Sequence, residues 1–356
     1  MPDTDDAPAR AAGVLSVDAM GGDLGPEAVV AGMARAIRAR PDMRFLLHGD
    51  EAALAPLVAK RRGLADHVEL RHAPGVVAMA DKPSQVMRTG KDTSMWSAVD
   101  AVRAGEAATV VSCGNTGALM AVSMLRLRKL PGVSRPAIAI LWPSRNPSGF
   151  NVMLDVGAEV RAEADDLLRY ALMGVSYARN GLGLARPRVG LLNVGTEENK
   201  GRPELREAHD RIEALEGAAD FDFVGFVEGG DIPGDRVDVI VTDGFTGNVA
   251  LKTGEGTARF VRDALGDAFR ATVMSKVAAL LAMASLKRLS KRIDPRRVNG
   301  GVFLGLNGTV VKSHGSADET GVEAALGLAW DLTASGFSER LRSRVAAATA
   351  TLEEGQ

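Results

Sequence analysis

The sequence predicts an α/β fold: a mostly parallel sheet with helices on both faces, arranged in two lobes. Strand-like and helix-like segments alternate along most of the chain, which indicates β-α-β crossovers. Several strand-like runs are continuously rich in Val, Ile and Leu, as expected where both faces of a sheet are covered. The chain has 356 residues, 46% of them hydrophobic, which is enough for a large core.

The predicted elements follow in chain order. Strands are predicted at 14–18, 44–49, 67–72, 108–112, 137–142, 150–157, 187–195, 221–227 and 236–244. Helical patterns fall between most of them, from about Pro26, over 50–62, from Ser94 and over about 117–129. The polar run at 79–94 predicts a loop, and one long Ala-rich helical pattern follows Glu319. We expect 14–352 to form one two-lobed unit and the acidic residues 1–13 to be a disordered tail.

Composition excludes several classes of function. The net charge is −2 and aromatic residues are scarce at 4%, so neither a basic footprint nor a stacking surface for nucleic acid is present. Cys113 is the one cysteine, which excludes an internal disulfide and a cysteine-based zinc site and fits a cytoplasmic protein. No run approaches the roughly 18 apolar residues that span a bilayer.

Glycine-containing junctions after the predicted strands are the candidate ligand sites, because open α/β sheets bind ligands beyond the carboxyl ends of their strands. They are 18–26, 112–119, 193–201, 241–256 and 305–318. The second and fourth share one pattern, a strand, a Gly/Thr/Asn segment and a helix. Such turns present backbone N–H groups and a helix dipole to an anion. The alternative is that Thr or Asn simply caps the next helix.

Nucleotide and catalytic-triad fingerprints are missing, and the five histidines show no metal-binding spacing. His314 is the histidine of interest, since Lys312 and Ser313 precede it and could bind an anion with it, although an ordinary surface turn is the alternative. Cys113 reads as a small buried hydrophobe rather than a nucleophile. Acidic residues at strand ends are either bases or helix caps; they are Asp18, Asp23 and Asp243.

A helical segment at 264–297 carries an apolar stripe and a basic end. The basic residues are Lys287, Arg288, Lys291, Arg292, Arg296 and Arg297. Core packing with a cationic helix end is one interpretation. The other is a docking surface for an acidic protein partner or an anionic membrane face.

Seven segments, in this order, resemble the bacterial phosphate acyltransferases that act between acyl-carrier protein and phosphate in phospholipid synthesis. They are DAMGGD (18–23), SMW (94–96), GNTGALM (114–120), LDVGA (154–158), NVGTEENKG (193–201), TDGFTGNVALKTGEG (242–256) and GLNGTVVKSHGSAD (305–318). The resemblance spans about 14–340. Two positions depart from the family pattern: Cys113 replaces an alanine and Glu159 an asparagine, so no family role is carried over to either.

The resemblance implies a fold of the isocitrate/isopropylmalate dehydrogenase type, shared with phosphotransacetylases, in a homodimer without metal, nucleotide or other cofactor. It implies that an acyl group passes from acyl-carrier protein to inorganic phosphate, giving acyl phosphate. The product would go to a membrane glycerol-3-phosphate acyltransferase. Cytoplasmic location with loose attachment to the membrane surface is therefore expected.

The residues support a mechanism for this reaction. Phosphate near neutral pH is largely dianionic, and a thiolate is a good leaving group, so no covalent enzyme intermediate is required. The protein must hold the dianion against the thioester and stabilise the oxyanion. The predicted catalytic residues are Lys312, His314, Asn115 and Asp243. The predicted substrate-binding residues are Gly114, Thr116, Gly117, Asp18, Gly21, Gly22, Thr246, Gly247, Asn248, Lys252, Asn307 and Ser313.

The hypothesis groups Asn115 and Thr116 with Thr246, Gly247 and Asn248 around one anion. Lys312 neutralises the phosphate, and His314 donates to the oxyanion or the leaving sulfur. Two alternatives are a short-chain phosphotransacetylase that uses coenzyme A and a non-catalytic anion-binding protein on the same fold.

Overall fold

The computed structural model describes residues 13–217, 219–293 and 300–354. It contains one 11-stranded sheet with the order β3-β2-β1-β4-β11-β10-β5-β6-β9-β7-β8. The strands are β1 Val14–Asp18, β2 Arg44–Gly49, β3 Val68–His72, β4 Thr109–Ser112, β5 Ala137–Pro143, β6 Phe150–Leu154, β7 Arg188–Leu192, β8 Asp222–Val227, β9 Val239–Val241, β10 Gly301–Leu304 and β11 Thr309–Lys312. Nearly all of the predicted tail and the basic residues Arg296 and Arg297 lie outside the described residues.

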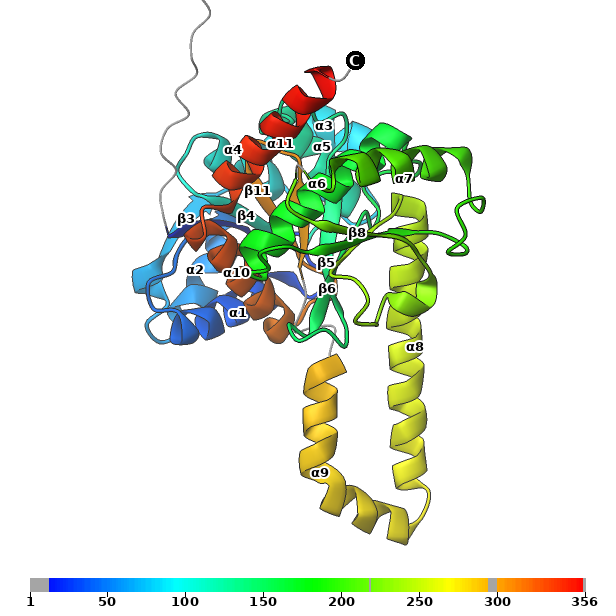
Figure 1. The fold of residues 1–356 in the computed structure, drawn as a ribbon. Coiled ribbons are helices and arrows are strands. Elements are labelled where there is room, and N and C mark those ends of the chain that lie inside the picture. The colour runs from blue at the N-terminus through cyan, green and yellow to red at the C-terminus, as the bar shows by residue number, and fades with distance from the viewer. Residues whose placement is uncertain (1–12, 218, 294–299, 355–356) are drawn as a thin grey trace, which may run out of the picture.

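Helices cover both faces of the sheet, as predicted (Figure 1). They are α1 Gly25–Ala39, α2 Glu51–Ala59, α3 Pro83–Thr89, α4 Ser94–Arg103, α5 Thr116–Arg126, α6 Ala164–Gly181, α7 Pro203–Leu215, α8 Gly244–Arg270, α9 Val273–Ile293, α10 Glu319–Ala334 and α11 Phe337–Glu354. One hydrophobic cluster joins the sheet to α1, α2, α6, α7, α10 and α11. A second joins its other face to α3, α4 and α5.

Strand direction divides the sheet in two. β1, β4 and β11 are parallel, but β10 is antiparallel to both β11 and β5, and β5 is antiparallel to β6. β6, β9 and β7 therefore run opposite to β1, β4 and β11. We call the edge where β1, β4 and β11 end the first edge, and the edge where β6, β9 and β7 end the second edge.

Helices α8 and α9 pack on each other and project from the body as a two-helix arm (Figure 1). The arm exposes large apolar side chains, among them Phe260, Val273, Met274, Leu280 and Leu281. No helix in the described part of the chain combines the length and the apolar character needed to cross a bilayer.

Two predicted elements differ from the structure. The predicted loop at 79–94 contains α3, which begins at Pro83, where proline is well placed in a first helical turn. The helical pattern after Glu319 is interrupted: α10 ends before Gly336, whose φ of +65° is left-handed, and α11 begins at Phe337.

Candidate active site at the first edge of the sheet

Three strands bring polar residues together at the first edge. The register pairs Asp18 at the end of β1 with Ser112 at the end of β4, and Ser112 with Lys312 at the end of β11. Just beyond the strands, the Ser313 N–H donates to the Ser112 carbonyl at 2.9 Å. The sequence patterns at 18–26, 112–119 and 305–318 thus converge on one place, as expected for neighbouring parallel strands.

Asp18 is a buried anchor of this site. Its carboxylate accepts hydrogen bonds from Ser94 Oγ at 2.6 Å, Ser112 Oγ at 2.7 Å and the Met20 N–H at 3.3 Å. Burial raises the pKa of the carboxyl group, and these bonds oppose that rise. Asp18 therefore joins the ends of β1 and β4 to the start of α4. Sequence reasoning assigned no role to Ser94, although it lies in the SMW segment.

Lys312 is 9% exposed, and its Nζ donates to the Cys113 carbonyl at 3.3 Å and to the Ser313 carbonyl. An ammonium group has three donors, so one remains for a ligand. Burial lowers the pKa of Lys312 to about 8, against the opposing influence of Asp18. The lysine is therefore still mostly charged at neutral pH and is poorly solvated, which strengthens its attraction for an anion.

His314 and Ser313 follow Lys312 at the same edge. The Ser316 N–H and Oγ lie 3.2 Å and 2.8 Å from His314 Nδ1, which makes Nδ1 an acceptor and assigns the ring proton to Nε2. Burial, and then the charge of Lys252, lower the pKa of His314, so the ring is neutral at neutral pH. Ser313 is 1% exposed, and its Oγ has no hydrogen-bond partner among the described residues.

Glycines allow the loops to approach closely. A Cβ at Gly21 would lie 2.7 Å from both Asp18 Oδ2 and the Cα of Gly114. A Cβ at Gly22 would lie 3.1 Å from the Cβ of Cys113. Larger residues at these positions would push the loops apart, which explains the glycines in both.

The loop before α5 combines a cap with free donors. Asn115 Oδ1 accepts from the Ala118 N–H at 3.0 Å, while its Nδ2 donates to the carbonyls of Met79 and Asp81, each at 2.9 Å. The Asn115 side chain is thus occupied within the protein. The N–H groups of Thr116 and Gly117, in the first turn of α5, have no intrahelical acceptor and form the positive end of the helix dipole.

Cys113 is buried, and burial raises the pKa of its thiol. The thiolate form, which is the nucleophile, is therefore disfavoured.

The 241–256 junction follows β9, which runs opposite to β4 and ends at the second edge, whereas Asn115 and Thr116 follow β4 at the first edge. There Asp243 caps α8 by accepting from the Thr246 N–H at 2.8 Å, and it pairs with Arg202. The other predicted residues of this junction, Gly247 and Asn248, lie in the same first turns of α8.

Asn307 also lies at the second edge, in the turn between β10 and β11, where its Nδ2 donates to the Lys129 carbonyl at 3.0 Å. The predicted substrate-binding residue Asn307 therefore lies at the opposite end of β11 from Lys312. Glu159, the second departure from the family pattern, pairs with Arg135 next to the buried Asp155, whose pKa burial raises to about 6.

Lys252 is the member of the 241–256 junction that reaches the first edge. It lies eight residues beyond Gly244, so α8 carries it about 12 Å back along the sheet. It forms an ion pair with Glu255 at 2.9 Å, and both charges act on His314. The cations of the site therefore come from both halves of the sheet.

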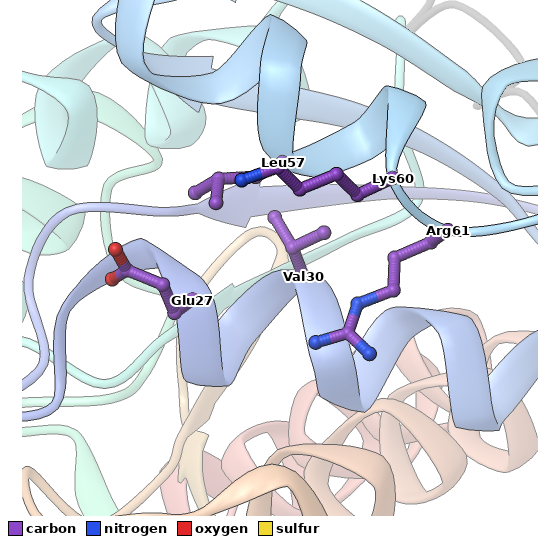
Figure 2. Close-up of a pocket in the computed structure, with 5 residues that line it drawn as sticks. All are labelled: Glu27, Val30, Leu57, Lys60 and Arg61. Atoms are coloured by element: carbon purple, nitrogen blue, oxygen red, sulfur yellow. The ribbon is translucent and has the colours of Figure 1, made fainter.

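A cavity of about 230 Å³ lies elsewhere, between α1 and the end of α2 (Figure 2). Its lining residues are Glu27, Val30, Leu57, Lys60 and Arg61. None of the predicted site residues lines it. Within residues 13–217, 219–293 and 300–354, no group of three or more His, Cys, Asp or Glu side chains is placed to hold a metal ion. The first edge instead offers ammonium, imidazole and backbone N–H donors, a set suited to an anion.

A family model described as "Fatty acid synthesis protein" matches residues 14–340. A phosphate acyltransferase of Jannaschia sp. is 71% identical over 95% of this chain and 92% of its own length. One of Paracoccus denitrificans is 70% identical over 95% of this chain and 91% of its own.

Among solved structures, a phosphotransacetylase from Streptococcus pyogenes has a TM-score of 0.59 at 18% identity, covering 90% of this chain and 94% of its own. The EutD phosphotransacetylase from Staphylococcus aureus has a TM-score of 0.57 at 15% identity, with the same coverage of both chains. These two likenesses concern the fold alone.

Proposed function

The chain belongs to the fatty acid synthesis protein family, and from this premise we propose that it is an acyltransferase that moves a fatty acyl group onto inorganic phosphate. The donor is the thioester of acyl-carrier protein, and the products are acyl phosphate and the free carrier thiol. The observation that carries the proposal is the buried Lys312 ammonium, which contacts the Cys113 carbonyl in the loop that leads into α5, together with the buried Ser313 hydroxyl that follows it. These groups can surround a dianion without a metal ion.

We assign phosphate to the space bordered by Lys312, Ser313 and the N–H groups of Thr116 and Gly117. Lysine supplies the compensating charge, and the hydroxyl and backbone groups donate hydrogen bonds to phosphate oxygens. Asp18 fixes the strand ends through Ser94 and Ser112 and does not touch the anion, because a carboxylate would repel it.

The reaction needs one nucleophilic attack and one departure. A phosphate oxygen attacks the thioester carbonyl carbon, the carbonyl electrons move to oxygen, and the tetrahedral intermediate collapses as the C–S bond breaks. We assign His314 to the developing oxyanion or the departing sulfur, as a donor through Nε2. Lys252 adds positive potential from the other half of the sheet.

We propose a homodimer that attaches loosely to the membrane surface, in the cytoplasm, where it hands acyl phosphate to a membrane glycerol-3-phosphate acyltransferase. The exposed apolar side chains of the arm support self-association, since so large an apolar surface favours a partner. The cations Lys287 and Arg288 on α9 favour an anionic partner near the arm. Residues 14–352 act as one catalytic unit in this proposal.

The test supplies palmitoyl-acyl-carrier protein with and without phosphate. Free thiol is measured, and acyl phosphate is measured in parallel as radiolabelled phosphate incorporated into product. We expect both products in equal amounts and only with phosphate. Acetyl-coenzyme A is assayed in parallel, and its faster conversion would favour a short-chain phosphotransacetylase. Phosphate binding with no conversion of either donor would favour a non-catalytic anion-binding protein.

A further inference from the structure

Leu24 is an exposed apolar residue at the N-cap of a helix, a position where polar residues are preferred. It occupies the N-cap of α1, is 52% exposed and makes no side-chain cap. Asn, Asp, Ser and Thr are preferred at this position because their side chains accept from the first turn, whereas leucine cannot. Helix capping therefore does not explain why a leucine stands at this position.

Met79 is a second exposed apolar residue at the same edge. It is 45% exposed, yet its backbone is held: its carbonyl accepts from Asn115 Nδ2 at 2.9 Å. Two residues on, Asp81 closes the turn by accepting from the Ala78 N–H at 2.8 Å. The loop is thus fixed while its methionine side chain remains in contact with solvent.

The two loops meet beside His314. A Cβ at Gly315 would lie 2.7 Å from Met79 Cε and 3.0 Å from Oδ2 of Asp23, the neighbour of Leu24. The Asp23 N–H also donates to the Gly315 carbonyl at 2.8 Å. Met79 and Asp23 therefore both lie at Gly315, the residue after His314, and Leu24 follows Asp23 in the chain.

We propose that Leu24 and Met79 form an apolar border that receives the fatty acyl chain of the donor thioester. The inference rests on the proposed function, which places the thioester carbonyl next to phosphate. From the carbonyl, the fatty acyl chain must extend away from a site rich in charged groups. Apolar side chains at the margin of that site lower the free energy of the bound acyl chain by shielding it from water. Methionine, with its unbranched and adaptable side chain, suits a flexible alkyl chain.

Serine variants test this border by chain-length preference. Leu24→Ser and Met79→Ser each lower the ratio of kcat/KM for palmitoyl- over butyryl-acyl-carrier protein by about fourfold, the loss expected for about one methylene contact. Leu24→Ser also supplies a capping hydroxyl, so its melting temperature stays level or rises. The matched control is Leu125→Ser, because Leu125 is 46% exposed at the far end of α5. An unchanged ratio in both variants, or the same fall in the control, overturns the inference.

A cross-linking experiment locates the bound fatty acyl chain and does not require turnover. Acyl-carrier protein carrying a fatty chain with a diazirine a few carbons from the thioester carbonyl is irradiated with the wild-type protein. Adducts in the peptides that contain 18–25 and 74–82 support the border, and adducts confined to the arm overturn it. A wild-type protein that forms no acyl phosphate contradicts the proposed function instead, and the adduct position still decides this inference.

Discussion

The buried ammonium of Lys312 gives the reaction an alkaline limit that an ordinary lysine would not impose. Its pKa is lowered to about 8 by burial, and only the protonated form offsets phosphate charge. At about pH 9 roughly one tenth of the lysine is protonated, whereas a lysine with a pKa of about 10.4 would remain almost fully charged. We therefore expect kcat/KM for phosphate to fall about tenfold between neutral pH and about pH 9.

The assay is the initial rate of acyl phosphate formation at limiting phosphate, between about pH 7 and pH 9.5. The dianionic fraction of phosphate only rises over this range, and kcat/KM reports the free enzyme, so a fall in rate at alkaline pH belongs to the protein. Lys312→Arg keeps its charge throughout, and its residual activity should show no alkaline limb. A flat wild-type profile, or an identical limb in the arginine variant, would refute the reasoning.

Three further variants separate the site from its surroundings. His314→Ala should lower kcat by about 100-fold with an unchanged melting temperature, the usual effect of losing a proton donor; near-normal turnover would remove His314 from the mechanism. Cys113→Ala should keep its turnover within about twofold, since the buried thiol is not the nucleophile; complete loss would revive a covalent route. Asp243→Ala should lower the free energy of unfolding in urea by about 1–2 kcal/mol, because the helix cap is lost. KM for phosphate should stay the same; a large rise in KM would show that the second edge takes part in phosphate binding.

The sequence predicted the elements of the fold well because burial and helix ends leave local signals. The β4 run Thr109–Ser112 is continuously buried, and its Val-rich pattern reports that directly. The break at Gly336 also had a local signal, a glycine between two helical patterns, which the Ala-rich composition obscured. Helix α3 was missed because only Val86 in it is buried, so it has no apolar stripe.

The site was predicted in part, since strand direction leaves no comparable signal. Lys312, Ser313 and His314 do lie beside the 114–117 loop, because β11 is parallel to β4. Thr246 was assigned to the same site from an equally good loop pattern. Three successive antiparallel pairings, β11 with β10, β10 with β5 and β5 with β6, leave its strand β9 running opposite to β11. Residue patterns report burial and turns, whereas the relative direction of strands depends on pairings between distant segments.

Direct attack by phosphate on the thioester is the central claim, and thiol release in a single turnover without phosphate tests it most directly. With protein in excess over palmitoyl-acyl-carrier protein, we expect no thiol release until phosphate is added, and then one thiol for each acyl phosphate formed. A burst of one thiol per site before phosphate is added would show an acyl-enzyme intermediate and would contradict the account.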